Sequence, residues 1–429
     1  MNSVQKHVKM AIVLFLLALL TLACKDDGTT QPPTPERVKL TLIDVSVKET
    51  FLHIAVTNAA SNETLSLQRN GTTVITFAAV ADTNIMDTAL TQTTTYQYRA
   101  SLTKSNSVTG TSNTVSAQTL APTSHNFTWQ TFLLGDGNNS ALYDVAVIGD
   151  SLIYAVGELY LRDSTGAIGD TPYNLTIWDG IRWDIRRLNF QGFPPVVRFV
   201  FAVNARDVWL DPWFHWDGQQ FSELPIAPVF NGTQWNRMWG SSDGRLYVVG
   251  NGGNIAYSPD DHSTWQRLAS GTTTNILDAL GVVNPVTGKE EVYCAASSFF
   301  DLGAEKKIVR ITERTHVDSI AWINRLLSGV WTNAGYPIYT SGDGLFENKS
   351  GAWREIPTGI YTNDIRGTGL NNIIAVGDVG FITHYNGIEW QTVASDVDAG
   401  YATVRLNGNL VCAVGRKSGR AIITMGRRN

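Results

Sequence analysis

The chain has 429 residues, a formal net charge of −5 and only 17% charged residues, against about a quarter in an average soluble protein. The lack of a basic surplus excludes a general nucleic-acid binder, and the 10% of aromatic residues argues against a disordered chain. The chain is rich in Gly, Thr, Asn, Val and aromatic residues rather than in good helix formers. We therefore predict an all-β protein of two or three domains without a nucleic-acid partner.

Residues 1–23 have the layout of a secretory signal peptide. A basic start precedes an apolar run that ends at Leu20 and is shorter than a typical transmembrane helix. The following Thr21-Leu22-Ala23-Cys24 resembles the lipobox of bacterial lipoproteins, although Thr stands where that motif prefers Leu. The resemblance implies that Cys24 becomes the lipidated first residue and anchors the chain to a membrane. The alternative is an ordinary signal peptide followed by an incidental cysteine.

Residues 24–37 are predicted to be a tether rather than a folded segment. Thr and Pro dominate the stretch 28–36, which has too few apolar side chains to form a core. Cys24-Lys25-Asp26-Asp27 also resembles the export signal of surface lipoproteins in Bacteroidota-type bacteria. We therefore expect an outer-membrane lipoprotein that is exposed on the surface of a bacterial cell.

Residues 38–121 alternate short strand patterns with turns, which is typical of a β-sandwich. Asn70-Gly71 between two of these patterns is a hairpin signal. Leu90, followed by Tyr96 in a Thr- and Tyr-rich strand, resembles the tyrosine corner of fibronectin type III domains, whose usual early Trp is missing here. The resemblance implies a spacer or binding module without a catalytic cluster. The predicted strands are residues 39–47, 51–57, 64–69, 73–78, 94–102 and 113–119.

Internal repeats dominate residues 127–429. Segments 239–257 and 366–390 both contain a strand, a turn, an apolar strand ending in Val-Gly and a third strand. Trp183 and Trp390, in the last strands of two copies, are 207 residues and five repeats apart. A repeat of about 41 residues has the length of a four-stranded β-propeller blade. The predicted last-strand aromatics are Trp183, Phe221, Trp265, Trp322, Trp353 and Trp390.

The last repeat, 401–429, has only three strands. Segment 127–132, just before the first repeat, has the pattern of the missing strand. A strand supplied from the N-terminal side would close the ring and remove its open edge. This closure predicts a seven-bladed β-propeller, whereas six blades would require discarding the degenerate repeat 276–322.

The turn before the last strand of several repeats carries a further resemblance. Ser258-Pro-Asp260-Asp-His262-Ser-Thr264-Trp265 is similar to the Asp-box except for His262 in place of Gly, and Trp-Asp-Gly-x-x-Trp (178–183) occupies the same corner of another repeat. The chain thus resembles the Asp-box (BNR-like) propellers, which include sialidases and photosystem II assembly factors. In these propellers the box is structural and lies away from the ligand face, so it does not identify an enzyme.

The sequence contains no convincing catalytic motif. Residues 240–244 fit a nucleophile elbow around Ser242, but the same position in other repeats is a hairpin turn and not the required strand-to-helix turn. The seven His lack zinc spacing, and no sialidase set of Arg, Tyr, Glu and Asp can be assigned. Cys294 and Cys412 lie in apolar strands and are expected to be buried and unpaired. We predict no catalytic residue, no metal and no cofactor.

When the repeats are aligned on the Val-Gly that ends the second strand, charged residues fall at the start of the innermost strand of several repeats. In a propeller, these starts surround one mouth of the central channel, where aromatic loop residues could join them in a peptide or glycan site. The alternative is that Asp and Arg pair structurally around the mouth while the aromatics belong to the core. The predicted ligand-binding residues are Asp144, Arg198, Arg237, Asp278, Asp364, Trp213 and Tyr361.

We therefore expect a monomeric, lipid-anchored envelope protein that binds a protein or glycan at the mouth of its propeller. A carbohydrate-active enzyme, either a sialidase-like glycosidase or a transferase, is the first alternative, because propellers of this type host such enzymes. It would need two carboxylates, or a Tyr–Glu pair, beside clustered arginines. The second alternative is an assembly or scaffold factor, which would favour one contiguous Arg patch.

Overall fold

The structure, a computed structural model, describes residues 37–429 except residues 138, 225–226, 242 and 260–263. The predicted signal peptide, Cys24, nearly all of the tether, Ser242, Asp260 and His262 lie outside the described residues. Val38–Asn429 form one compact unit of strands and turns, with no α-helix in its described part. The predicted all-β class is therefore confirmed. Three short 3-10 turns interrupt the strands: η1 (Asp211–Trp213), η2 (Pro228–Phe230) and η3 (Asn251–Gly253).

The first seven strands form two packed antiparallel sheets. One sheet has the order β1 (Val38–Val45), β2 (Thr50–Val56), β5 (Asp82–Asp87). The other has the order β4 (Thr72–Ala78), β3 (Thr64–Arg69), β6 (Thr95–Lys104), β7 (Ser107–Gln118). β5 is not among the predicted strands, because its sequence is largely polar and only Ile85 and Asp87 are buried in it.

A hydrophobic core fills the space between the two sheets. The hydroxyl of Tyr96 accepts a 3.0 Å hydrogen bond from the backbone N–H of Thr91, which is the kind of contact that defines a tyrosine corner. The assignment to the fibronectin type III family remains a prediction. Fully buried members of the core include Leu40, Leu52, Ile54, Leu65, Leu67 and Tyr98.

From Phe127 onward, the chain forms seven four-stranded antiparallel sheets, the blades of a β-propeller. Blades 1 to 3 contain β9 (Ala141–Gly149), β10 (Leu152–Leu159), β11 (Tyr173–Trp178), β12 (Trp183–Arg186); β13 (Val200–Asn204), β14 (Asp207–Leu210), β15 (Phe214–Trp216), β16 (Phe221–Glu223); β17 (Trp235–Gly240), β18 (Leu246–Gly250), β19 (Asn254–Ser258), β20 (Gln266–Ala269). Blades 4 and 5 contain β21 (Ile276–Asn284), β22 (Lys289–Ala296), β23 (Lys307–Thr312), β24 (His316–Ile320); β25 (Leu327–Trp331), β26 (Ile338–Gly342), β27 (Leu345–Asn348), β28 (Trp353–Ile356). Blades 6 and 7 contain β29 (Thr362–Gly369), β30 (Asn372–Gly377), β31 (Ile382–Tyr385), β32 (Trp390–Ala394); β33 (Ala399–Asn407), β34 (Leu410–Lys417), β35 (Arg420–Arg428), β8 (Phe127–Leu134).

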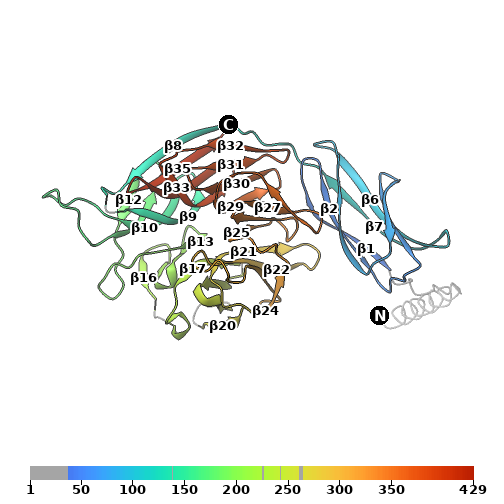
Figure 1. The fold of residues 1–429 in the computed structure, drawn as a ribbon, viewed down its shortest axis with the longest axis horizontal. Helices are drawn as coiled ribbons and strands as arrows, with labels where there is room; N and C mark the ends of the chain where they lie inside the picture. The colour runs from blue at the N-terminus through green and yellow to red at the C-terminus, as the bar shows by residue number, and fades with distance from the viewer. Residues whose placement is uncertain (1–36, 138, 225–226, 242, 260–263) are drawn as a thin grey trace, which may run out of the picture. The chain divides into compact units, whose positions relative to one another are not determined.

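The first strand of each of blades 1 to 7 lies at the centre of the propeller. In Figure 1, the labels of β9, β13, β17, β21, β25, β29 and β33 cluster in the middle of the propeller, and those of β12, β16, β20, β24 and β32 lie at its margin. Each inner strand contacts the inner strand of the next blade, and β33 contacts β9, so the ring is closed. The starts of the inner strands therefore surround one mouth of the channel, as the repeat alignment predicts.

The seventh blade is completed by a strand from the other end of the domain. β8 pairs antiparallel with β35 over its whole length, from Phe127 opposite Arg428 to Leu134 opposite Ala421. This pairing confirms both the predicted closing strand and the count of seven blades. The degenerate repeat 276–322 forms blade 4, although its predicted aromatic Trp322 lies beyond the end of β24 and packs on Trp353 of the next blade instead.

The Val-Gly that ends the second strand has a steric explanation. A Cβ at Gly377 would overlap the carbonyl oxygen of Tyr361, just before the inner strand of the same blade. Gly157, Gly250, Gly342 and Gly415 face the equivalent carbonyl in their own blades. The repeated glycine therefore lets the first two strands approach closely at the channel mouth.

The turn before the last strand is held by side-chain capping. Asp179 accepts 2.8 Å hydrogen bonds from the backbone N–H groups of Ile181 and Arg182, and Asp217 and Asn386 make the equivalent contacts.

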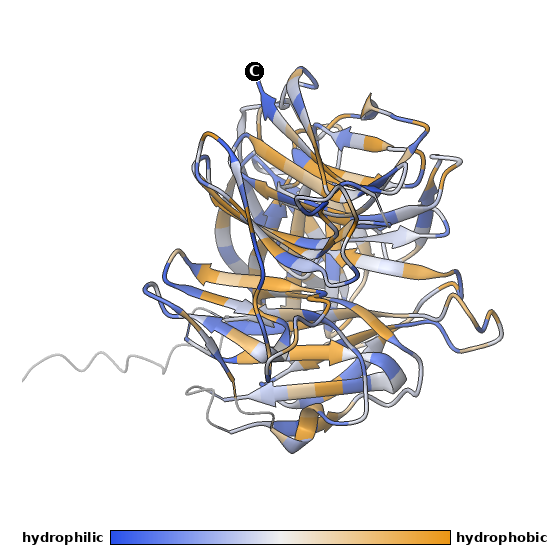
Figure 2. Cartoon of the chain, turned by 90° about the vertical axis from the view of Figure 1, so that its left-hand side faces the viewer, coloured by the Kyte–Doolittle hydropathy of each residue, from blue (hydrophilic) through white to orange (hydrophobic). Residues whose placement is uncertain are grey.

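Hydrophobic residues lie on the strands of the blades more than on the connecting turns (Figure 2). Cys294 and Cys412 are buried, free thiols, as predicted, and burial raises the pKa of both.

Candidate functional site

The charged residues predicted at the channel mouth lie at the starts of the inner strands, but most of them are buried. Asp144 of β9 and Asp278 of β21 have no exposed surface, and Asp364 of β29 is 1% exposed. Arg237 of β17 is also buried. Such groups are stable in a protein interior only when partners compensate their charge.

Three aspartates and three arginines compensate each other in a closed, alternating ring, which we call the Asp–Arg ring. Its members in order are Asp144, Arg237, Asp278, Arg366, Asp364 and Arg405. The six contacts in that order, starting from Asp144–Arg237 and ending at Arg405–Asp144, measure 2.6, 3.2, 2.5, 2.8, 2.8 and 3.1 Å. Equal numbers of opposite charges make the ring neutral, so it presents no contiguous Arg patch.

Each aspartate of the Asp–Arg ring also binds the backbone of the following blade. The Asp144 carboxylate accepts a 3.2 Å hydrogen bond from the N–H of Val200, Asp278 accepts one of 3.0 Å from Val330, and Asp364 one of 3.1 Å from Val404. Burial alone would raise the pKa of Asp364, but Arg366, Arg405 and Arg237 outweigh it and hold the pKa below its ordinary value. The Asp364 carboxylate is therefore ionised, and the arginines and backbone N–H groups around the ring engage all three carboxylates.

Arg366 and Arg405 are members of the ring that are not among the predicted site residues. Arg366 lies two residues after Asp364, and Arg405 lies two residues after Thr403. Side chains at positions i and i+2 of a strand point to the same face, so this spacing is the signal that could have found them. The Thr403 hydroxyl donates a hydrogen bond to Asp364, which places Thr403 in the same network.

The remaining predicted site residues lie outside the Asp–Arg ring. The guanidinium of Arg198 lies 5.5 Å from the ring centre of Tyr143. Trp213, in η1, packs on Phe190 at 5.0 Å, and Tyr361 packs on Phe299 at 5.5 Å. All three predicted residues are partly buried, and a ligand-binding role for them stays a prediction.

An open cavity of about 570 Å³ lies above the Asp–Arg ring, between the starts of the inner strands. Arg237 connects the ring to this cavity because it belongs to both. A second cavity of about 440 Å³ continues the first. The residues that line both cavities are Asn139, Asp378, Gly400 and Arg416. We call the two cavities together the mouth groove.

Polar side chains of both signs line the mouth groove. Glu158 accepts hydrogen bonds from the hydroxyls of Tyr143 and Tyr160, the latter at 2.9 Å. Burial and then Glu158 raise the pKa of both hydroxyls, that of Tyr160 to about 12. Arg416 is exposed and has no ion-pair partner among the residues that the structure describes. The groove therefore offers hydrogen-bonding groups and a free cation, but no net basic charge.

Apolar side chains project around the mouth groove. Phe300 is 98% exposed and Leu302 is 68% exposed, in the loop between β22 and β23, next to the groove residue Phe299. Val397, between β32 and β33, is 80% exposed and lines the groove, as does the exposed Val379. Apolar side chains gathered around a groove are typical of an interaction surface.

The described part of the chain contains no group of three or more His, Cys, Asp or Glu side chains that could hold a metal ion. His215 pairs with Asp207 at 2.8 Å, and the buried His384 contacts His125 at 2.9 Å. Within the same residues, no helix is long and apolar enough to span a membrane.

The fold and the site define a seven-bladed β-propeller with a groove at one mouth of its channel. No protein-family model matches the sequence, and no curated protein matches it. Among solved structures, YCF48 bound to a D1 peptide is 16% identical, with coverage of 72% of this chain and 99% of its own and a TM-score of 0.52. YCF48 from Cyanidioschyzon merolae is 15% identical, with coverage of 69% and 98% and a TM-score of 0.50. At this identity, the similarity establishes a shared propeller fold.

Proposed function

We propose that this protein is a binding protein of the bacterial cell envelope, and that its mouth groove holds an extended segment of a partner protein. The observation that carries the proposal is the group of exposed apolar side chains, with Phe300 and Val397 foremost, around a groove of mixed charge. Exposed aromatic residues at the centre of a contact surface are the usual source of binding energy between proteins.

The composition of the groove favours a polypeptide over a glycan or a polyanion. Val379 and Val397 line the groove, and Leu302 is exposed in the same loop as the groove residue Phe299. All three are aliphatic, so they match apolar side chains better than the faces of sugar rings. Asp378 and Asp398 line the groove together with Arg416, so a uniformly anionic partner would meet repulsion as well as attraction. One structure with the same fold is described as YCF48 bound to a D1 peptide, although a shared fold does not fix a shared ligand.

The same proposal includes the location and the domain order. Residues 1–23 would direct export, Cys24 would carry the lipid, residues 24–37 would serve as the tether, residues 38–121 would form a fibronectin type III-like spacer, and residues 127–429 would form the binding propeller. The lipobox resemblance supports the first three assignments, and the contact between Tyr96 and Thr91 supports the fourth. The propeller would then be presented to partners outside the membrane as a monomer.

Random peptides displayed on phage and selected on the full chain test the binding function. Selected peptides should carry aromatic or aliphatic residues, and Phe300→Ser should weaken their binding about tenfold, as measured by fluorescence anisotropy. Ile181→Ser, which alters an exposed residue on the turn between β11 and β12, is the matched control and should not change the affinity. Peptides whose affinity does not respond to Phe300→Ser would contradict the proposal.

A carbohydrate-active enzyme is the second candidate, and one observation favours it. Tyr143 and Glu158 form a hydrogen-bonded pair in the mouth groove, with Arg198 stacked on Tyr143. Against this candidate, burial and Glu158 raise the pKa of Tyr143, which opposes formation of a phenolate nucleophile. The test is hydrolysis of aryl glycosides and sialosides by the full chain. Turnover that disappears in Tyr143→Phe would establish this candidate, and no turnover would exclude it for those substrates.

A further inference from the structure

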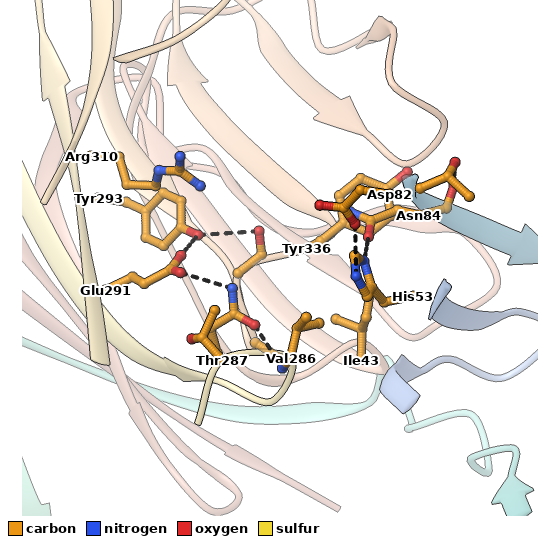
Figure 3. Close-up of a pocket in the computed structure, with 14 residues that line it drawn as sticks. Ile43, His53, Asp82, Asn84, Val286, Thr287, Glu291, Tyr293, Arg310 and Tyr336 are labelled. Atoms are coloured by element: carbon orange, nitrogen blue, oxygen red, sulfur yellow. Dashed lines mark hydrogen bonds and ion pairs between the residues drawn. The ribbon is translucent and has the colours of Figure 1, made fainter. Parts of the chain in front are cut away.

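A cavity of about 400 Å³ lies where the sandwich meets the propeller, away from the mouth groove (Figure 3). β1, β2 and β5 supply one wall, through Ile43, His53 and Asp82 to Asn84. Blades 4 and 5 supply the other wall, including Glu291 and Tyr336. Both walls belong to the single compact unit Val38–Asn429.

Specific contacts hold the two walls together. Ile43 and Phe51 of the sandwich share one buried core with Trp331 and Tyr339 of blade 5. The Lys349 ammonium pairs with Glu49 at 2.9 Å, and the Asn333 side chain donates a 3.0 Å hydrogen bond to Asp44. A buried apolar core reinforced by polar contacts fixes the relative positions of the walls, so the cavity is preformed.

The propeller wall presents a fixed array of planar polar groups. The Glu291 side chain is 4% exposed and accepts hydrogen bonds from Asn284 at 2.9 Å and from the Tyr293 hydroxyl at 2.6 Å. Arg310, beside Tyr293, is oriented by two hydrogen bonds to Asp318, of 2.9 and 2.6 Å. A carboxylate, a carboxamide and a guanidinium are therefore held in place before any ligand arrives.

The sandwich wall presents a second polar group across the cavity (Figure 3). His53 lies between Asp82 at 2.8 Å and Asn84 at 2.9 Å, one partner for each ring nitrogen. Tyr336 contributes an aromatic ring, which packs edge-on against Phe51 at 5.8 Å. The cavity thus combines polar groups on two facing walls with an aromatic surface.

We propose that this cavity is a binding site for a neutral saccharide. Arg310 and Asn84 each have a side-chain nitrogen beyond the atoms that bind Asp318 and His53, and these nitrogens can donate to sugar hydroxyls. Tyr336 offers a ring against which an apolar sugar face can stack. The lining acids are Asp82 and Glu291, and the lining Arg310 is already paired with Asp318, so the site has no uncompensated arginine that would select an anion. The volume lies within the range of about 300–1,000 Å³ typical of small-ligand pockets.

Saturation-transfer NMR on the full chain tests this site with defined probes. The neutral probes are glucose, galactose, mannose and N-acetylglucosamine, and the charged comparators are N-acetylneuraminic acid and glucose 6-phosphate. We expect transfer to at least one neutral probe, with an affinity that falls about tenfold in both Asn84→Leu and Tyr336→Leu. Gln92→Leu, an exposed polar-to-apolar change elsewhere on the sandwich, should leave the signal intact.

Three results of the NMR experiment would overturn the proposed saccharide site. Transfer to none of the four neutral probes, transfer to the charged comparators alone, or a neutral signal that survives both Asn84→Leu and Tyr336→Leu would each overturn the proposal. Phe300→Ser should not alter saccharide binding, because Phe300 is not among the residues that line this cavity and follows the mouth-groove residue Phe299 in the chain. A failure of the proposed peptide-binding function therefore leaves this test unaffected.

Discussion

Arg405 and Asp144 are 261 residues apart in the chain, yet their side chains meet at 3.1 Å where the last blade closes against the first. This contact is the final one in the Asp–Arg ring. The same two blades are also joined through β8, which leads directly into blade 1 after completing blade 7. Closure of the propeller thus depends on a strand pairing at its margin and on ion pairs at its centre.

Removal of one cation from the Asp–Arg ring should be strongly destabilising. In Arg405→Ala, the carboxylates of Asp144 and Asp364 would stay buried with one arginine fewer between them. Loss of one partner of a buried ion pair typically costs about 3–5 kcal/mol, and we expect a loss of about 3 kcal/mol in the free energy of unfolding measured by urea denaturation. Arg416→Ala, which removes an exposed arginine from the mouth groove, is the control and should change that free energy by less than about 0.5 kcal/mol. Equal stability of the two variants would contradict a structural role for the ring.

The sequence predicts the blades well because their signals are periodic. The spacing of Trp183 and Trp390 sets the repeat length, and the three-strand repeat 401–429 requires a closing strand that residues 127–132 can supply. These features depend on local patterns that recur in every copy. A strand pattern that is too weak to identify in one copy becomes recognisable when it recurs in successive repeats.

The Asp–Arg ring could be predicted only in part, because it depends on contacts between blades. Alignment of the repeats finds Asp144, Asp278 and Asp364, because these residues occupy the same position in their repeats. Arg366 and Arg405 occupy a different position and are therefore not found. No local pattern shows that an arginine of one blade meets an aspartate of another. β5 is missed for a similar reason: its polar sequence becomes a strand through pairing with β2, a long-range contact.

The glycine that ends the second strand provides a steric test of the blade geometry. In Gly377→Ala, the new Cβ would overlap the backbone at Tyr361 and Thr362, so β29 and β30 would have to move apart at the channel mouth. We expect a loss of about 1–3 kcal/mol in the free energy of unfolding, in the range of other overpacked sites. Gly400→Ala is the matched control, since a Cβ there meets nothing within 4 Å. A neutral Gly377→Ala would show that the close approach is not needed.

The lipid anchor can be tested without reference to any ligand. If Cys24 carries an acyl chain, metabolic labelling with an alkyne fatty acid should mark the chain when it is expressed in a bacterium, and Cys24→Ser should abolish the label. Cys294→Ala is the control, because Cys294 is a buried free thiol and not an acylation site. A wild-type chain that carries no label would favour the ordinary signal peptide instead.

The junction between sandwich and propeller should show a pH-dependent stability through Asp44. Burial raises the pKa of this carboxyl to about 6, although hydrogen bonds from Asn333 and Val45 oppose the shift. Because the folded state holds the proton more tightly than the unfolded chain, the stabilisation is fully present below about pH 4 and is lost as the pH rises through about 6. At higher pH the native state carries a partly buried negative charge.

Asp44→Asn removes that charge and should therefore stabilise the protein only on the alkaline side. We expect a gain of about 1 kcal/mol in the free energy of unfolding near pH 8 and little change near pH 4, from urea denaturation at both values. The side chain of Asn333 can turn over and donate or accept as the new carboxamide requires. Asp398→Asn, on an exposed loop, is the control and should shift stability equally at both pH values. A loss of stability in Asp44→Asn near pH 8 would mean that the junction needs the carboxylate as an acceptor from Asn333, and that this hydrogen bond outweighs the cost of burial.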